Sequence, residues 1–210
     1  MDIKISSQHR KELLRFLLLK TAAVRSGVKP AELLRVQHCY RTRNAEGFQF
    51  CLYRKDILEL MRLEYCELRV DNDSSLILFY HRKKLAEVLA QPAVQKVLQI
   101  SGYPAKDGID EALRFLCDRF LTEKIPHEVG VFIGYPVKDV VGFMKNLPRT
   151  PVHRGDWAVF GNAQESIKRM SLYRQVENIA KEAFEVCDDL QTFFDRISII
   201  NINDRSIANG

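Results

Sequence analysis

Residues 65–81 constrain the fold of this chain more than any other segment. Two runs rich in β-branched and aromatic residues, "YCELRV" and "LILFYHR", flank the polar cluster "DNDSS". A cluster of this kind between two strand-forming runs is typical of a tight turn, so the segment predicts a β-hairpin. The fold must therefore accommodate at least one small sheet.

Helical periodicity dominates the rest of the chain. Apolar residues recur at helical spacing in several segments, and Asn162 is a candidate cap for the longest of them. These segments are 8–25, 54–63, 83–90, 92–100, 109–123, 136–147 and 162–187. The stretch 33–53 is ambiguous, whereas 128–133 and 156–161 predict short strands. The pattern predicts an α+β (mixed α/β) domain in which several helices pack on a small sheet.

The length of 210 residues suits one domain. We predict a single α+β domain over 1–187, which ends with a long helix, and a C-terminal extension over 188–210. The extension begins with a helical pattern and ends in the β-prone run "ISIININD". That run predicts an edge strand, through which two chains could also associate.

Composition narrows the class of protein. No apolar run is long enough to cross a bilayer, and the N-terminus lacks a signal-peptide pattern, so we expect a cytoplasmic protein. The five cysteines, Cys39, Cys51, Cys66, Cys117 and Cys187, form no CxxC pair. This spacing argues against a disulfide scaffold and a zinc site, and it predicts free thiols.

The net charge of +5 is concentrated at the N-terminal end of the chain. Residues 1–64 carry 13 Lys and Arg against 7 Asp and Glu. The basic residues stand singly among apolar ones, as they do on solvated helix faces, and no nucleic-acid-binding motif accompanies them. We therefore do not expect nucleic acid as a partner.

The hexapeptide GYPxKD occurs twice, at 102–107 and 134–139. Glycine permits a sharp reversal and proline suits the first turn of a helix, so each copy predicts a turn into a helix. We predict that 134–136 joins a strand to a helix and that 102–104 precedes a second helix. Anion binding at such a helix start is the alternative, but Asp139 beside the turn would repel a phosphate.

His127 and Glu128 precede the second copy of this turn. They do not belong to an HExxH zinc motif, because position 131 is Val131. On a strand over 128–133 they would point to opposite faces and could not act as a dyad. We predict that both residues chiefly anchor the strand and the helix start, and that a ligand site lies on the same rim with Tyr135 and Asp139.

The segment "PHEVGVFIGYPVKDVVGF", residues 126–143, resembles the hallmark of a family of proteins of unknown function. These proteins have about this length and come from anaerobic Firmicutes, clostridia above all. The likeness extends to "GVKPAELL", "LILFYHRKKLAEVL" and "GDWAVFGNAQESIKRMSLYR". The chain departs from the family at Thr21, where members commonly carry a cysteine, so any chemistry of that thiol is in doubt here.

The resemblance implies a cytoplasmic bacterial protein whose gene lies near flavodoxin or iron-uptake genes. Because the sequence contains no GxSxG, P-loop or GxGxxG motif, a non-enzymatic ligand-binding or accessory module is the favoured function. It would be linked to iron, haem or flavodoxin-type metabolism, with a small molecule or a protein as partner and no specific cofactor indicated. The alternative is an enzyme whose site gathers His127, Glu128, Tyr135 and Asp139.

Overall fold

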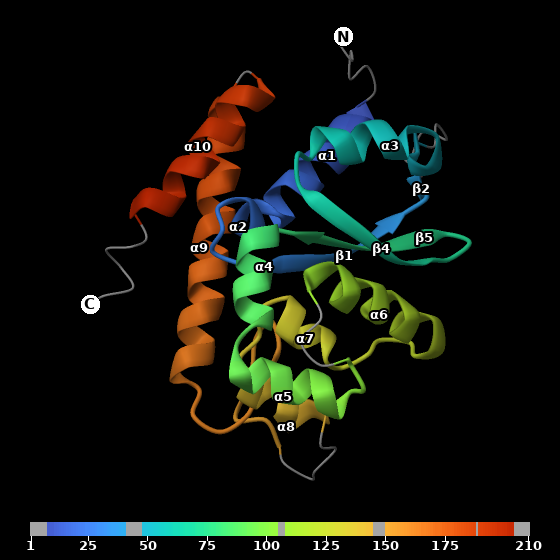
Figure 1. Cartoon of the computed structure of the whole chain (residues 1–210). Helices are drawn as coiled ribbons and strands as arrows, with labels where there is room; N and C mark the ends of the chain where they lie inside the picture. The colour runs from blue at the N-terminus through green and yellow to red at the C-terminus, as the bar shows by residue number, and fades with distance from the viewer. Residues whose placement is uncertain (1–7, 41–47, 105–107, 145–149, 188, 204–210) are drawn as a thin grey trace.

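The computed structural model describes residues 8–40, 48–104, 108–144, 150–187 and 189–203. Within these ranges, side-chain surroundings are described for all residues except 8–11, 39–40, 48–53 and 198–203. The elements drawn in Figure 1 follow in chain order. They are α1 (Gln8–Lys20), α2 (Ala22–Arg25), β1 (Ala31–Gln37), β2 (Cys39–Tyr40), β3 (Phe48–Gln49), α3 (Phe50–Leu60), β4 (Glu64–Val70), β5 (Ser74–Tyr80), α4 (Arg82–Leu89), α5 (Pro92–Ile100), α6 (Ile109–Thr122), α7 (Val129–Phe132), α8 (Val137–Met144), β6 (His153–Arg154), β7 (Ala158–Val159), α9 (Gln164–Val186) and α10 (Leu190–Asn203).

The predicted hairpin is confirmed as β4 and β5. Together with β1 it forms a three-stranded antiparallel sheet in the order β1-β5-β4, so β5 is the central strand. All seven residues of β5 are buried. Ile77 and Phe79 belong to one hydrophobic cluster, whereas Leu76, Leu78 and Tyr80 belong to another. Because both faces of the strand are covered, its sequence is a continuous apolar run rather than an alternating one.

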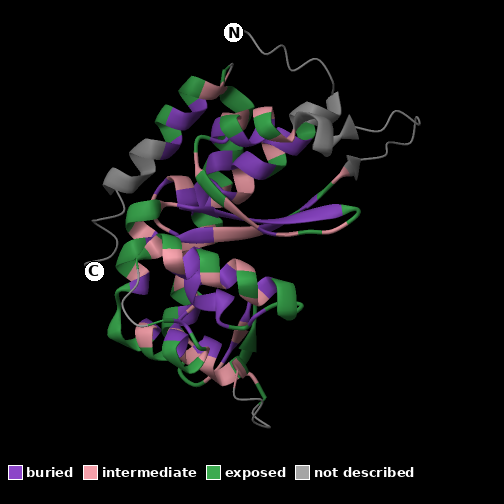
Figure 2. Ribbon diagram, turned by 45° about the vertical axis from the view of Figure 1, so that its right-hand side comes forward, coloured by how far each residue is buried: buried purple, intermediate pink, exposed green. Residues whose placement is uncertain are grey.

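Two layers of helices enclose this sheet (Figures 1 and 2). Residues of α1, α2, α3, α9 and α10 join Ile77 and Phe79 in the first cluster, and residues of α4 to α8 join Leu78 in the second. The sheet is thus the middle layer, with its central strand almost wholly buried in Figure 2. The predicted α+β domain is confirmed.

The predicted strand at 128–133 is wrong, because the segment forms the short helix α7. Ile133 N donates to Val129 O (3.1 Å), which is a helical hydrogen bond. Val129, Gly130, Val131 and Phe132 are all buried. A short run that is buried on every side shows no periodicity, so its β-branched residues suggested a strand that the packing does not form.

The predicted edge strand in the C-terminal extension is also wrong. Residues 190–203 form α10, and Asp189 stabilises its first turn, because its Oδ1 accepts a hydrogen bond from Thr192 N (2.9 Å). Phe193, Phe194 and Ile197, which follow helical spacing, pack in the first hydrophobic cluster. Tertiary burial of this face favours the helix over the β propensity of the sequence. The boundary at residue 187 stays a prediction.

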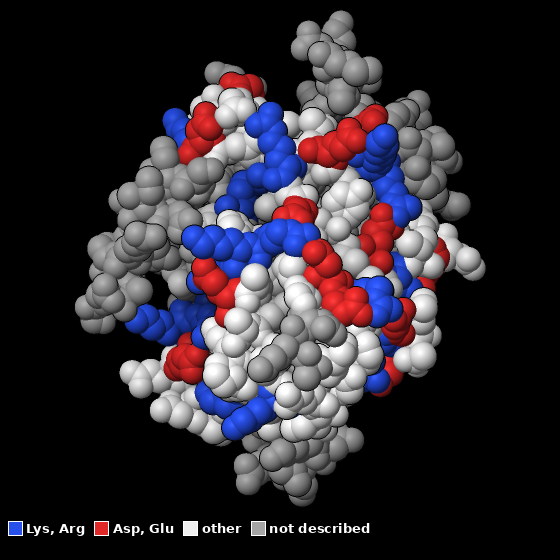
Figure 3. All heavy atoms as spheres, viewed as in Figure 1, with Lys and Arg blue, Asp and Glu red and all other residues white. Residues whose placement is uncertain are grey.

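Ion pairs connect the basic N-terminal part of the chain to acidic residues on later elements, two of them on α9. Lys20 pairs with Glu177 (2.7 Å), Arg15 with Glu185 and Arg54 with Glu67. On the face drawn in Figure 3, the Lys and Arg side chains lie among Asp and Glu side chains. In the part of the chain that the structure describes, no helix has the length and apolar character needed to span a membrane.

Candidate functional site

Both GYP segments are turns that end one helix before the next begins. Gly134 has a φ of +85°, Gly134 N donates to Val131 O (3.2 Å) and Tyr135 N donates to Gly130 O (2.9 Å). Gly102, with a φ of +88°, ends α5 in the same way. This pair of bonds is the Schellman motif, in which glycine adopts the left-handed conformation after a helix. A helix follows each turn as predicted, but helix α7 precedes the second turn in place of the predicted strand. Asp107 lies outside the described residues.

Gly134 is held between two distant segments of the chain. A Cβ atom at this position would lie 2.7 Å from Pro30 Cδ and 2.8 Å from Tyr173 Oη. The Gly134 carbonyl accepts hydrogen bonds from Arg169 Nη1 (2.9 Å) and Tyr173 Oη (3.3 Å). The turn is therefore fixed against the loop before β1 and against α9, and it places Tyr135 with little freedom.

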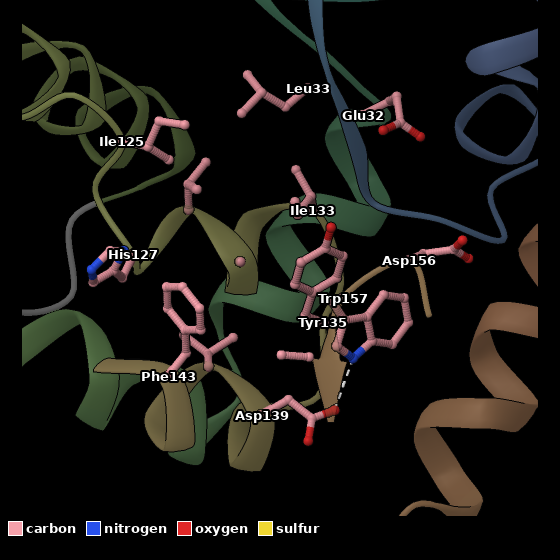
Figure 4. A pocket seen from close by; sticks show the side chains of 14 residues that line it. Glu32, Leu33, Ile125, His127, Ile133, Tyr135, Asp139, Phe143, Asp156 and Trp157 are labelled. Carbon is pink, nitrogen blue, oxygen red and sulfur yellow. Dashed lines mark hydrogen bonds between the residues drawn. The ribbon is translucent and has the colours of Figure 1, made fainter. Parts of the chain in front are cut away.

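A cavity of about 360 Å³ opens beside this turn (Figure 4). Its volume is in the range of small-molecule sites. The wall comes from β1, the segment before α7, α7 itself, α8 and the residues around β7. It consists of Glu32, Leu33, Ile125, His127, Val129, Gly130, Ile133, Tyr135, Asp139, Val140, Phe143, Asp156, Trp157 and Ala158.

Aromatic rings form two parts of this wall. Tyr135 and Trp157 stack with ring centroids 4.3 Å apart and an interplanar angle of 23°. His127 meets Phe143 edge to face, with centroids 4.9 Å apart. Figure 4 shows these two pairs at different sides of the cavity, with aliphatic residues between them. The wall thus offers an apolar surface suited to a flat hydrocarbon or aromatic group.

Two carboxylates lie on the side of the cavity away from His127 (Figure 4). Glu32 pairs with the buried Lys29 (2.7 Å), and Asp156 pairs with the exposed Arg174 (2.7 Å). Neither Lys29 nor Arg174 lines the cavity, whereas Glu32 and Asp156 do. Burial, followed by the negative charges of Glu32 and Asp156, raises the pKa of Tyr135 to about 12. The Tyr135 phenol is therefore neutral at physiological pH and can donate as well as accept a hydrogen bond, whereas Glu32 and Asp156 make this side of the cavity acidic.

Asp139 is buried, and its carboxylate is fully engaged within the protein. Oδ1 accepts from Lys138 Nζ (2.7 Å) and Phe160 N (2.9 Å), and Oδ2 accepts from Trp157 Nε1 (2.9 Å) and Ser166 Oγ (2.6 Å). Burial alone would raise its pKa, but these hydrogen bonds outweigh that effect and hold the pKa of Asp139 below its ordinary value. Asp139 thus connects α8 to β7 and to the start of α9, and it orients the Trp157 indole.

Glu128 points away from the cavity into the protein. Its side chain is 1% exposed and accepts a hydrogen bond from Arg119 Nε (2.8 Å), which joins the start of α7 to α6. The Tyr103 hydroxyl is close by, and burial, followed by the charge of Glu128, raises the pKa of Tyr103. His127, in contrast, is exposed, and its ring packs edge to face against Phe143. The two residues do not form a dyad.

Of the four residues predicted for the rim, His127, Tyr135 and Asp139 line the cavity and Glu128 does not. Sequence reasoning missed Glu32, Phe143, Asp156 and Trp157 among others. One signal was present, because Trp157 is the only tryptophan of the chain and lies in the "GDWAVFG" segment. Among the described residues, no group of three or more His, Cys, Asp or Glu side chains could hold a metal ion.

The sequence comparison now places the chain in a family. The family model described as "Protein of unknown function (DUF3793)" matches residues 17–193. The chain belongs to this family. The matched range contains every residue of the cavity wall. No curated protein and no solved structure matches the chain.

Proposed function

We propose that this DUF3793 protein is a non-enzymatic binding module for a small molecule with a flat apolar body and a cationic or hydrogen-bond-donating end. The apolar body would lie between the His127–Phe143 pair and the Tyr135–Trp157 stack. The donating end would meet the carboxylates of Glu32 and Asp156. The observation that carries the proposal is this division of one cavity into an apolar side and an acceptor side.

The charge of the cavity wall favours a ligand with a hydrogen-bond-donating or cationic group over an anionic ligand. Of the described residues that line the cavity, Glu32, Asp139 and Asp156 are acidic and none is Lys or Arg. A ligand carboxylate or phosphate would lose its hydration without gaining a cationic partner, which costs free energy. An ammonium group would gain charge-assisted hydrogen bonds.

The wall also supports binding over catalysis. None of the described residues that form it is a serine, threonine, cysteine or lysine, the usual nucleophiles. His127 could accept a proton, but Glu32 and Asp156 lie across the cavity from it and do not orient its ring (Figure 4). The alternative enzyme site around His127, Glu128, Tyr135 and Asp139 would also need Glu128 in the cavity.

The sequence-based link to iron, haem or flavodoxin metabolism stays a prediction, as do the clostridial origin and the cytoplasmic location. Haem propionates and flavin phosphates are anionic, so the acidic wall disfavours both as occupants of this cavity. A link to redox metabolism would therefore act through another ligand or through a protein partner.

Thermal-shift titration tests the proposal with pairs of probes that share an aromatic body and carry opposite charges. The probes are 2-phenylethylamine against 3-phenylpropanoate, and tryptamine against indole-3-acetate. A ligand at a hundred times its Kd stabilises the native state by about 2.7 kcal/mol, so the amines should raise Tm by several degrees and the acids should not. Equal shifts with amines and acids, or none with either, would reject the proposal.

Pairs of variants, one at the cavity wall and one elsewhere, show whether the probes bind in this cavity. Glu32→Gln removes a carboxylate of the wall, and Glu177→Gln removes one from an equally short Lys ion pair (2.7 Å) elsewhere. Phe143→Ala removes a half-exposed ring of the wall, and Phe16→Ala removes a similarly exposed ring on α1. The amine shift should fall in the first variant of each pair and persist in the second.

A further inference from the structure

Two thiols lie in contact between the sheet and α6, away from the cavity. Cys66 on the edge strand β4 and Cys117 on α6 have Sγ atoms 3.1 Å apart. Both side chains are partly buried, so each retains some access to solvent. Cys187, the third cysteine whose side chain the structure describes, is also a free thiol and lies after α9.

The setting allows the two sulfur atoms to approach further. A disulfide has an S–S bond of about 2.0 Å, so the atoms must move together by about 1 Å. Cys66 is on an edge strand whose register shifts between Glu67 and Arg69, next to the thiol. A strand with an irregular ladder on one side and no partner strand on the other can adjust its backbone locally.

The two thiols differ in acidity, as an attacking thiol and a resolving thiol do. Hydrogen bonding from Cys66 lowers the pKa of the Cys117 thiol. The same contact, together with burial, raises the pKa of Cys66. The 3.1 Å contact lets one thiol donate to a thiolate on the other sulfur, and the direction of the shift favours that thiolate at Cys117. Thiolates are the nucleophiles in thiol–disulfide exchange.

We propose that Cys66 and Cys117 form a reversible dithiol–disulfide site whose substrate is a low-molecular-weight disulfide. The Cys117 thiolate attacks one sulfur of the disulfide RSSR, forms a mixed disulfide and releases the thiolate RS⁻. The Cys66 thiol then loses its proton to that thiolate and attacks the Cys117 sulfur, which releases the second thiolate and closes the Cys66–Cys117 bond. The second thiolate takes up, through solvent, the proton that Cys117 released when it ionised. In total the two protein thiols are oxidised by two electrons, and one RSSR is reduced to two RSH.

Glutathione disulfide serves as the probe, with the folded full-length chain first reduced and freed of reductant. After equilibration and acid quench, non-reducing peptide mapping should find Cys66 linked to Cys117 while Cys187 keeps a free thiol. Returning the sample to reduced glutathione should restore both thiols. The ratio of oxidised to reduced protein should follow a two-electron dependence on the glutathione couple.

Serine variants separate the two roles. In Cys66→Ser, a mixed disulfide with glutathione should accumulate at Cys117, because the serine hydroxyl can still donate to the thiolate but cannot resolve the adduct. In Cys117→Ser, Cys66 should at most form a mixed disulfide with glutathione, because no second thiol remains in contact with it to close the bond. Cys187→Ser should behave as the parent does.

Several outcomes would overturn the proposal. Separate glutathione adducts on Cys66 and Cys117 in the parent would show that the pair does not close. A Cys66–Cys117 disulfide that forms only in urea, or a disulfide that joins other cysteines, would also contradict the proposal. The mapping of the parent chain needs no variant, so the proposal stays testable if a serine variant fails to fold.

Discussion

Replacement of Asp139 by alanine should destabilise the protein strongly. The carboxylate accepts four hydrogen bonds, and its removal leaves four donors without their acceptor. Lys138 is partly exposed and can turn to water, but the donors on Trp157 and Ser166 are buried. The hydrogen-bond donors of these two groups would stay buried without an acceptor.

The expected loss of unfolding free energy follows from the two buried donors, on Trp157 and Ser166, that Asp139→Ala leaves without an acceptor. A buried polar group left without a hydrogen bond costs about 1–3 kcal/mol, so two of them cost about 2–6 kcal/mol. The whole stability of a domain is about 5–15 kcal/mol, so Asp139→Ala should remove a large part of it. Asp139→Asn keeps one acceptor oxygen and should cost roughly half as much.

Urea denaturation followed by far-UV circular dichroism measures this loss. The matched control is Asp118→Ala, which removes an exposed carboxylate 3.7 Å from Arg114 and should cost less than about 0.5 kcal/mol. If Asp139→Ala and the control lose equally little free energy of unfolding, the carboxylate does not anchor β7 and α9. The assignment of Asp139 to structure rather than ligand binding would then be wrong.

The same carboxylate should make the stability depend on pH. A group whose pKa is lowered on folding stabilises the protein above its unfolded-state pKa, and this contribution is lost as the pH falls through its folded-state pKa. Since the pKa of Asp139 is held below its ordinary value of about 4, the advantage of the parent over Asp139→Asn should be constant near neutrality and shrink below about pH 4. A difference in unfolding free energy between the parent and Asp139→Asn that is the same at pH 3 as at pH 7 would contradict this prediction.

Two further matched pairs test the structure around the cavity by the same denaturation assay. Glu128→Gln should cost about 1–3 kcal/mol, because it removes the charge of a carboxylate that is 1% exposed, whereas Glu123→Gln should cost less than about 0.5 kcal/mol. Both carboxylates pair with Arg119, so similar losses of unfolding free energy would show that the burial of Glu128 does not determine its contribution to stability. Gly134→Ala should cost more than Gly161→Ala, since both glycines have a positive φ but only Gly134 would place a Cβ within 3 Å of other atoms. Equal costs would mean that backbone conformation alone explains the glycine at 134.

The parts of the fold that sequence predicts well are those with a clear period or a clear turn. The hairpin of β4 and β5 has a polar turn between two β-prone runs, and α6 and α9 show sustained helical spacing. Residues 128–133 lack both signals, because they are short and buried on all sides. The strand prediction failed there, although the conclusion that His127 and Glu128 face different surroundings holds.

The cavity was only partly predictable, because its wall joins segments far apart in the chain. Tyr135 and Asp139 stand beside a conspicuous turn, so sequence analysis found them. Glu32 on β1 and Trp157 before β7 reach the same cavity only through tertiary packing. No local pattern encodes such a meeting, and the same holds for the contact between Cys66 and Cys117.

The chain contains a direct reporter of ligand binding, because its only tryptophan, Trp157, forms part of the cavity wall. Titration with 2-phenylethylamine, which carries no indole, should therefore change the intrinsic tryptophan emission in a saturable way. The change should require a higher concentration in Glu32→Gln and should be absent with 3-phenylpropanoate. Saturable changes of equal affinity with the amine and the acid, or a response unaltered by Glu32→Gln, would contradict the proposed division of the cavity into an apolar side and an acceptor side.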